Sequence, residues 1–366
     1  MIRENLASFD TTNIIVKIGA TKYSFWKSAS IHIGMGEFCR EATFDVSDGN
    51  ESNAAQILMD SPCTVICDGL TVVTGYIDDV GVNYDSKSHS ITIKARSKTC
   101  DLVDCSYIGD TQFNQESARG IINRICAPFG IRVIWKCTDW QIGELNTNVG
   151  DTCAAIISEI CKRGGVFYTD DEYGNLIITD LTSTPSQATL FNPPKDTGSN
   201  ILVGSVHYSS RDRFSEYRVV SQATAQMGDE TADNAYTHDG VVRDHGVRRY
   251  RPKLVIAETS QDSAADTNTA EQEYMASTAA AADFGYTTNG WKTQYGRIWY
   301  AGAFVNVEDS MAHCMTKLVV KSCDLTISGT GGRITTFKLA YPNAMIKNYV
   351  PRTRVRDPWY YSGKEI

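Results

Sequence analysis

Residues 64–77 read TVICDGLTVVTGYI. Two apolar runs flank the dipeptide at residues 68–69, Asp-Gly, which is a turn signal between strands. Short segments rich in β-branched and aromatic residues fill the surrounding chain, at residues 14–18, 23–33, 42–46 and 90–95. Clusters of Gly, Asn, Asp and Ser separate them, and this rhythm is typical of an antiparallel sandwich or barrel. We therefore expect a first β-barrel domain over residues 1–98.

The pattern changes to helical spacing after residue 98. Apolar side chains within residues 121–129 recur at helical intervals, and Asn114 is placed to cap that helix. A second helix is expected over residues 153–163, because Asp151 or Thr152 can cap an apolar stripe there.

A hairpin follows the second predicted helix. Gly164 offers a left-handed stop to that helix, and two apolar runs then flank a polar turn at residues 170–175. Residues 182–200 are rich in Ser, Thr and Pro and are typical of a linker. The sequence therefore predicts a small α+β domain with its linker over residues 99–200.

Strand patterns resume in the second half of the chain. We expect a second β-barrel domain over residues 201–350, with an inserted helix at the Ala-rich residues 267–284, and a C-terminal tail over residues 351–366. The strand rhythm of residues 65–93 resembles that of residues 305–337. Duplication of one strand plan explains this, and the rhythm common to all β-proteins is the competing explanation.

Composition restricts the function. The 366 residues carry 35 Lys and Arg against 43 Asp and Glu, a net charge of −8. A protein that binds nucleic-acid phosphates needs a dense cationic surface, so this charge balance argues against that function. No stretch reaches the roughly 18 apolar residues of a spanning helix, so neither membrane insertion nor secretion is expected. Eleven cysteines are an odd number, and we expect them to be reduced and mostly buried.

Catalytic and metal-binding patterns are weak. Asp170, Asp171 and Glu172 crowd together as the carboxylates of glycosidases do, but they fall at a predicted hairpin tip, where Asp is favoured for turn geometry and solvation. The six histidines lack the spacing of a metal site, and neither a nucleophile elbow nor a phosphate-binding loop occurs. We therefore expect no enzyme activity, no metal and no cofactor.

Two basic stretches stand out in this acidic chain. Arginine beside Trp and Tyr is the composition of protein–protein hot spots, although alternating Arg on a strand is also typical of a solvated face. For the C-terminal stretch, a disordered end is the alternative. The candidate partner-interface residues are Arg249, Arg251, Arg352, Arg354, Arg356, Trp359, Tyr360 and Tyr361.

A series of short motifs spans nearly the whole chain. The most specific is the block at residues 101–105, DLVDC, and the other blocks lie at residues 23–29, 44–48, 75–78, 84–90, 96–99, 126–130, 163–179, 249–252 and 299–342. In this order the blocks resemble the bacteriophage Mu gpP-like baseplate hub family, which is related to the T4 baseplate hub. The tail after residue 350 matches no element of that family.

The resemblance implies a non-enzymatic scaffold of a contractile phage tail. It implies a mainly β (α+β) fold, with two similar antiparallel barrels flanking the small α+β domain. Three chains would form a homotrimeric ring whose six quasi-equivalent barrels adapt a six-fold tail tube, or its initiator protein, to a three-fold central spike. Baseplate wedge proteins are further implied partners, and DNA would pass through the lumen without specific binding.

The resemblance also implies a location and leaves alternatives open. The protein would be made in the host cytoplasm and end in the baseplate of the virion tail. One alternative is the hub portion of a type VI-like spike. Another, from a different class, is a β-rich glycan-binding or glycan-active protein, which the aromatic content and the Asp-rich turns suggest.

Overall fold

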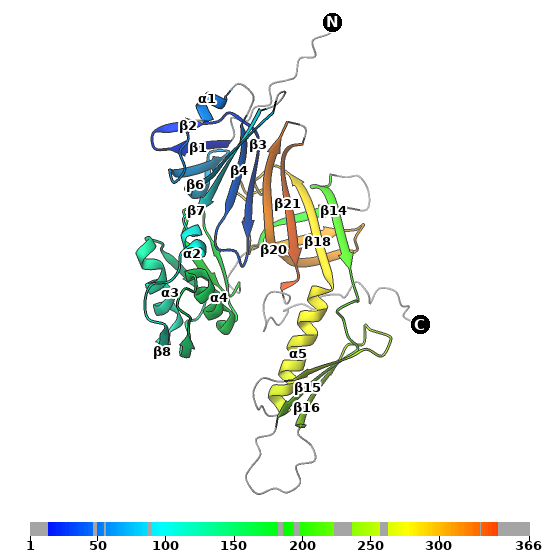
Figure 1. The fold of residues 1–366 in the computed structure, drawn as a ribbon. Helices are drawn as coiled ribbons and strands as arrows, with labels where there is room; N and C mark the ends of the chain where they lie inside the picture. Colours follow the sequence, from blue (N-terminus) through cyan, green and yellow to red (C-terminus); the bar gives the residue numbers. More distant parts are fainter. Residues whose placement is uncertain are drawn as a thin grey trace.

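The computed structural model describes residues 14–46, 50–54, 56–85, 89–181, 186–193, 198–222, 236–256, 263–329 and 331–342. Strands outweigh helices, so the expectation of a mainly β protein is confirmed. Figure 1 shows two strand units side by side, an α+β module below the first unit and a helix with a small sheet below the second. Within the described ranges, no helix combines the length and apolarity needed to cross a membrane.

The first unit contains the stretch quoted above. Its elements are β1 (Ile14–Ile18), β2 (Thr21–Tyr23), β3 (Trp26–Gly34), β4 (Glu41–Val46), α1 (Glu51–Ala54), β5 (Pro62–Cys67), β6 (Leu70–Tyr84) and β7 (His89–Ser97). Cys67 pairs with Leu70 across a two-residue turn in which Asp68 and Gly69 have φ of 48° and 80°. Positive φ at both positions matches the twist of a hairpin, which confirms the turn predicted from Asp-Gly.

The second unit begins earlier than predicted. It consists of β13 (Ser186–Asn192), β14 (Ile201–Tyr208), β18 (Ala282–Asn289), β19 (Phe304–Asp309), β20 (Cys314–Ser328) and β21 (Gly332–Ala340). The interpretation of residues 182–200 as a linker is wrong in its centre, because β13 pairs in parallel with β19. Asn200, the residue before β14, also contacts β13. Its side chain donates to Thr189 O at 2.8 Å and accepts from Phe191 N at 2.8 Å.

The two units repeat one strand plan. The antiparallel order β3-β4-β7-β6-β5 of the first unit recurs as β14-β18-β21-β20-β19 in the second, in the same chain order. The last three strands have 6, 15 and 9 residues in both units. Registers also agree, since Ile77 pairs with Ala95 and Val320 pairs with Leu339, and a bulge follows directly in both units. The predicted duplication is confirmed, although the sequence motifs align it slightly out of structural register.

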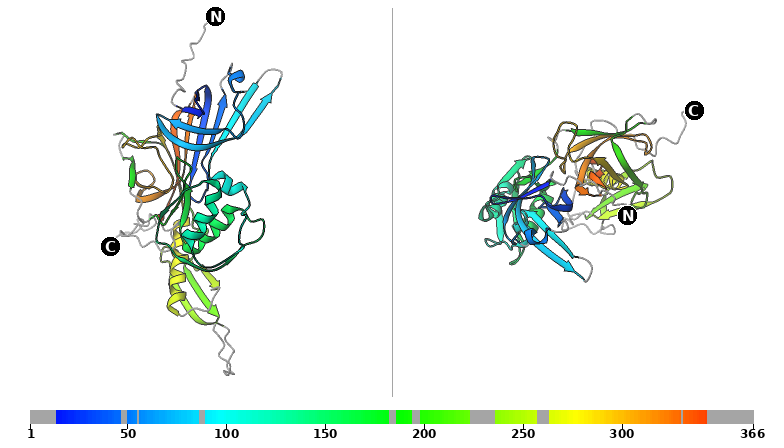
Figure 2. Two further views of the ribbon diagram at one scale, coloured as in Figure 1. Left: turned by 90° about the vertical axis from the view of Figure 1, so that its left-hand side faces the viewer. Right: turned by 90° about the horizontal axis from the view of Figure 1, so that it is seen from above.

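One ladder joins the two units. A bulge near Lys321 divides β20, so that residues 314–319 pair with β19 and residues 322–328 pair with β3. The described strands of both units therefore form one thirteen-stranded sheet, seen in two further views in Figure 2. Strand pairing among them closes neither expected barrel, because the free edge of β3 is taken by β20. A single apolar cluster that includes Ile31, Phe44, Leu325 and Phe337 crosses the join.

The α+β module has a core of its own. It comprises α2 (Cys100–Asp104), β8 (Gln112–Ser117), α3 (Ala118–Cys126), a 3₁₀ turn (Ala127–Phe129), β9 (Val133–Lys136), β10 (Gln141–Asn146), α4 (Cys153–Gly164), β11 (Phe167–Asp170) and β12 (Leu176–Thr179). Ser117 rather than Asn114 caps α3, because residues 112–117 pair with β10 as a strand. Thr152 caps α4, and the left-handed residue is Gly165 rather than Gly164.

The described residues between 209 and 281, called the arm below, form a separate small unit. It comprises β15 (Glu216–Gln222), β16 (Tyr236–Arg243), β17 (Pro252–Ile256) and α5 (Ser263–Ala280), with the sheet order β16-β15-β17. Tyr217 is fully buried in its core and meets Tyr274 of the helix edge-on. The predicted helix is confirmed, but it ends before residue 284 because β18 begins at Ala282.

A charged triad lies on the ladder between the units. His32 of β3 is directly opposite Asp324 of β20, and its Nδ1 lies 2.6 Å from an Asp324 carboxylate oxygen. Its Nε2 lies 2.9 Å from a Glu37 carboxylate oxygen. The hydrogen bond to Asp324, followed by that to Glu37, raises the pKa of His32 to about 10. The imidazolium is therefore charged at neutral pH, and it links the two units electrostatically.

Replacing His32 tests this link. The variant His32→Gln should lower the free energy of unfolding at about pH 6 by roughly 1 kcal/mol, because the pairs are partly solvated. Because folding raises the pKa of His32, its charged contacts stabilise the folded state fully below the unfolded-state pKa of 6.5. That stabilisation is lost as the pH rises through the folded-state pKa of about 10. The difference from wild type in urea denaturation should therefore shrink between about pH 6 and pH 10.

The exposed His245 of the arm provides the matched control, because it lies away from both sheet units. The variant His245→Gln should leave the unfolding free energy unchanged at both pH values. A difference for His32→Gln that grows with rising pH would contradict a charged His32.

Candidate functional site

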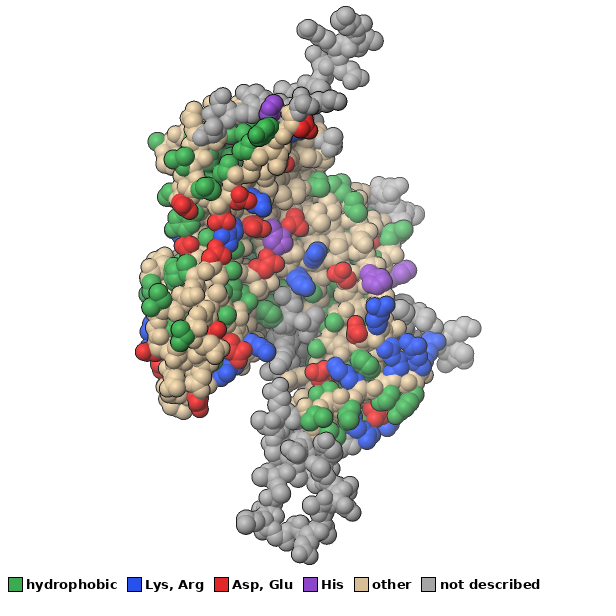
Figure 3. Space-filling model, viewed as in Figure 1, with side chains coloured by type: hydrophobic (Ala, Val, Ile, Leu, Met, Phe, Trp, Pro, Cys, Tyr) green, Lys and Arg blue, Asp and Glu red, His purple; other side chains and the backbone are tan. Residues whose placement is uncertain are grey.

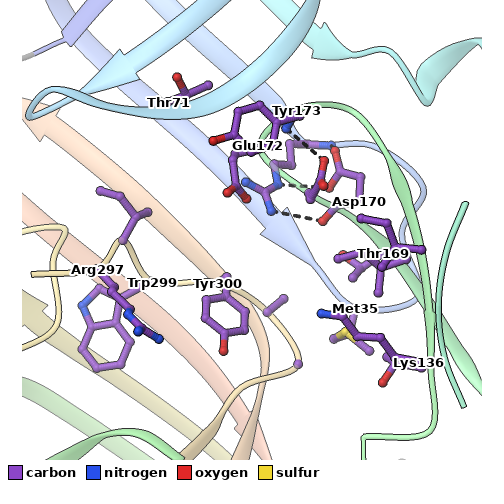
Figure 4. Close-up of a pocket in the computed structure, with 18 of the residues that line it drawn as sticks. Met35, Thr71, Lys136, Thr169, Asp170, Glu172, Tyr173, Arg297, Trp299 and Tyr300 are labelled. Atoms are coloured by element: carbon purple, nitrogen blue, oxygen red, sulfur yellow. Dashed lines mark hydrogen bonds and ion pairs between the residues drawn. The ribbon is translucent and has the colours of Figure 1, made fainter. Parts of the chain in front are cut away.

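The main cavity lies where the first unit, the α+β module and the second unit meet. Its volume is about 700 Å³, and Figure 4 shows the side chains that enclose it. The first unit contributes Met35, Arg40, Leu70 and Thr71; the module contributes Ile134, Lys136, residues 169–173, Ile177 and Thr179; Leu181 and residues 296–302 complete the lining.

Arg40 is the centre of this junction. Its side chain is 6% exposed, and its guanidinium donates to the Asp170 carboxylate, the Asp170 carbonyl and the Val72 carbonyl at 2.8 to 3.1 Å. Its backbone N–H lies 3.1 Å from both Ser97 Oγ and the Asp170 carboxylate. Arg40 therefore joins β6 and β7 of the first unit to the end of β11 in the module.

Further contacts fix the same joint. Thr169 Oγ1 donates to the Gly34 carbonyl at 2.9 Å, and Thr74 Oγ1 donates to the Glu172 carbonyl at 2.8 Å. The rings of Phe38 and Tyr168 stack at 4.2 Å. Phe38 belongs to the apolar core of the module although it lies between strands of the first unit. Polar and apolar contacts together hold the module in one orientation.

The acidic group at residues 170–172 has a structural role. Asp170 and Asp171 are buried rather than solvated, so that part of the sequence prediction is wrong. Asp171 does serve turn geometry, because its carboxylate accepts from Tyr173 N and from both Asn175 nitrogens at 2.7 to 2.9 Å. Burial raises the pKa of Asp170, and the charge of Arg40 opposes that rise. Since Arg40 is 130 residues away in sequence, no local pattern reveals the pair.

The cavity holds no reactive constellation among its described residues. General acid–base catalysis needs a titratable group that is free to exchange a proton, yet the carboxylates of Asp170 and Asp171 are already engaged. The opposite wall is built around Trp299, which is buried against Phe337 at 4.7 Å. The side chains shown in Figure 4 therefore form a fixed joint between three parts of the chain.

The predicted interface residues fall in two places. Arg352, Arg354, Arg356, Trp359, Tyr360 and Tyr361 lie outside the described residues. Arg249 is exposed, whereas Arg251 is partly buried and its guanidinium donates to the carbonyls of Ser210 and Arg211. The structure therefore does not bring Arg249 and Arg251 into the cavity at the junction.

The cysteines agree with the expectation of buried thiols. All eleven are unpaired, eight are buried, and only Cys105 is exposed. Burial raises the pKa of Cys63 and of Cys126 to about 12, so these thiols stay protonated at neutral pH. Protonated thiols are poor nucleophiles and ligands, and these side chains pack as small apolar groups.

Comparisons with known proteins agree with this fold. Residues 13–97 match the family "Mu phage baseplate assembly protein GpP-like, N-terminal", and residues 99–180 match "Baseplate hub protein gp44-like, second domain". The chain is 28% identical over 284 residues to the baseplate hub protein gp44 of Escherichia phage Mu, which covers 74% of this chain and 73% of that protein.

Two crystal structures are similar over most of the chain. The 43 kDa tail protein of prophage MuSo2 from Shewanella oneidensis has a TM-score of 0.76 and 26% identity, and the match covers 91% of this chain and 99% of that one. The tail protein from Neisseria meningitidis has a TM-score of 0.73 and 21% identity, with 91% and 98% covered. The second likeness concerns the fold alone.

Breaking the Arg40–Asp170 pair tests the joint. Arg40→Met leaves a buried carboxylate without its cation, so the free energy of unfolding should fall by about 3–5 kcal/mol. The double variant Arg40→Met/Asp170→Leu should lose less than the two single variants together, because no uncompensated charge remains. Urea denaturation followed by tryptophan fluorescence measures the losses.

Arg124→Met is the matched control, because its pair with Glu116 is 44% and 36% exposed. That variant should lose at most about 1 kcal/mol. Additive losses at Arg40 and Asp170 would show that the two side chains do not act as a pair.

Proposed function

We infer the function from the premise that this chain belongs to the Mu GpP-like baseplate hub family, whose hub domains its residues 13–97 and 99–180 match. The protein is a structural baseplate hub protein of a phage tail. We propose further that three copies form a ring around the tail axis, adapting a six-fold tube to a three-fold spike. The observation that supports this most is the duplicated strand plan, since three chains with two equivalent units present six.

The free edges of the sheet support closure of such a ring. Within the chain, β3 of the first unit pairs with residues 322–328 of β20 in the second. The equivalents of these strands are β14 in the second unit and residues 79–84 of β6 in the first, because the bulge at Asp78 corresponds to the one at Lys321. Among the described strands, neither equivalent edge has a pairing partner on its outer side. Pairing β6 of one copy with β14 of the next would repeat the internal ladder and remove both edges.

Side-chain exposure on the two edges fits this pairing. Val82 and Tyr84 of β6 are 58% and 77% exposed, and Leu202 and Val203 of β14 are 58% and 60% exposed. Aligning the two units on their bulges and transferring the register of β3 and β20 to the equivalent strands places Asn83 opposite Ser205 of the next copy. Apolar side chains left in water on an edge strand are a feature of surfaces that another chain covers.

The remaining parts of the proposal follow from the ring. Its partners are the central spike, the tail tube or tube-initiator protein, and the baseplate wedge proteins. DNA passes through the lumen without specific binding, because a net charge of −8 on each chain opposes adhesion of phosphate. The protein assembles in the host cytoplasm and functions in the virion baseplate as a scaffold rather than an enzyme. The Asp-rich hairpin no longer suggests glycan chemistry, because Arg40 and the turn engage Asp170 and Asp171.

The oligomeric state is the first test. Size-exclusion chromatography with light scattering should give a particle of three times the mass of one chain at micromolar concentration, because an obligate ring buries on the order of 2,000 Å² or more at its interfaces. A strict monomer that also ignores added spike and tube proteins would contradict the proposal.

Cross-linking tests the register between copies. The variant Asn83→Cys/Ser205→Cys should form disulfides between copies on mild oxidation, visible as dimers and trimers on a non-reducing gel, because directly opposite strand residues lie within disulfide reach. The control Asp79→Cys/Ser205→Cys places its thiols four residues out of register. Equal cross-linking of both variants would contradict the proposed pairing.

A further inference from the structure

A basic loop at the base of the arm is not used by the joint or by the ring. Residues 244–251, called the arginine loop, connect β16 to β17 and carry Arg248, Arg249 and Arg251. Together with Ser209, Ser210 and Arg213, the loop lines a cavity of about 450 Å³. Figure 3 shows Lys and Arg side chains gathered at this side of the arm, close to the second unit. This local charge contrasts with the net charge of −8 of the whole chain.

A buried ion pair holds the start of the loop. Arg213 Nε and Nη2 donate to the two Asp244 oxygens at 2.6 and 3.1 Å, and the side chains are 5% and 2% exposed. The same carboxylate accepts from Gly246 N at 2.8 Å. A Cβ at Gly246 would lie 2.6 Å from Arg213 Nη2, so a larger residue there would have to displace the guanidinium that pairs with Asp244.

Arg251 holds the end of the loop. Its guanidinium donates to the carbonyls of Ser210 and Arg211 at 2.6 and 2.5 Å, and it lies over the ring of Phe214 at 5.3 Å. Its backbone N–H donates to Ser215 Oγ at 2.7 Å, and its carbonyl accepts from Ser215 N at 2.8 Å. Both ends are therefore fastened to residues 209–215, and the backbone loses little further freedom when a ligand binds.

The middle of the loop faces solvent. Arg248, Arg249 and Tyr250 are exposed, with Tyr250 at 82%. In the adjoining strand β17, Leu254 and Ile256 are 63% and 62% exposed on the sheet face that α5 does not cover. The arrangement combines guanidinium groups, a phenol and an apolar strip on a rigid support. Tyr and Arg in such a setting are the residues that dominate protein–protein binding energy.

We propose that the arginine loop is the docking site for an acidic segment of another tail protein. Carboxylates of the segment pair with Arg248 and Arg249 beside the cavity, and its apolar side chains contact Tyr250 and the strip on β17. Planar guanidinium groups suit carboxylates because two parallel N–H···O bonds form. DNA is the less suitable ligand, because phosphate binding relies on many cationic contacts and draws nothing from an apolar strip. This inference rests on the proposed function only for the identity of the partner as a tail protein.

Fluorescence anisotropy of the full-length protein tests the proposal, with a fluorescein-labelled peptide of alternating Glu and Leu as the probe. The wild-type protein should bind the peptide, and Arg248→Ala/Arg249→Ala should weaken binding at least about tenfold. Raising the salt from about 50 to 500 mM should also weaken it, because exposed charge pairs are screened. The matched control Arg119→Ala/Arg132→Ala removes the same charge from exposed sites on the α+β module and should bind as wild type does.

Four results would overturn the proposal. The first is absence of binding to the wild type, and the second is an equal loss in the control variant. The third is a short DNA duplex that binds more tightly than the peptide and displaces it. The fourth is a trimer that Arg248→Ala/Arg249→Ala dissociates, because the loop would then contact another copy.

Light scattering on the same samples separates this proposal from the ring. A monomeric wild type that still binds the peptide refutes only the ring.

Discussion

The ladder between β3 and residues 322–328 of β20 is the constraint on which the architecture depends. An unpaired edge strand is a template for aggregation. Here the edges of β3 and β20 form hydrogen bonds with each other within one chain. Because the ladder is antiparallel and in register with both hairpins, the apolar faces of the two units meet as one core. The charged triad around His32 lies on this ladder, where it adds a directional contact to the backbone pairing.

The orientation of the α+β module depends on a different kind of contact. Arg40 and Asp170 are nearly fully buried, and desolvation of such a pair offsets much of its Coulomb attraction. Every guanidinium contact has one defined partner, so the pair admits few alternative arrangements of module and sheet.

The arm and the joint use arginine in two ways. The guanidinium groups of Arg40, Arg213 and Arg251 bind partners within the chain and fix the backbone around them. Arg248 and Arg249 are held outward by those contacts and face solvent. Among the described residues, the arginine loop thereby presents a compact basic surface, which in the proposed docking favours a single orientation of the acidic partner.

The sequence alone determined the local elements of this protein. Alternation of apolar residues and the Asp68–Gly69 turn identified the hairpins, because strand period and turn chemistry depend on neighbouring residues. Helical spacing likewise identified α3 and α4, and alanine content identified α5. The rhythm of the strands suggested the duplication, which the strand order then established. The tertiary structure decided what distant residues do together. The ladder between β3 and β20, the strand β13 within the supposed linker and the burial of Asp170 by Arg40 all join segments far apart in the chain. Such pairings depend on which edges and charges the folded sheet brings together, and no local pattern encodes that.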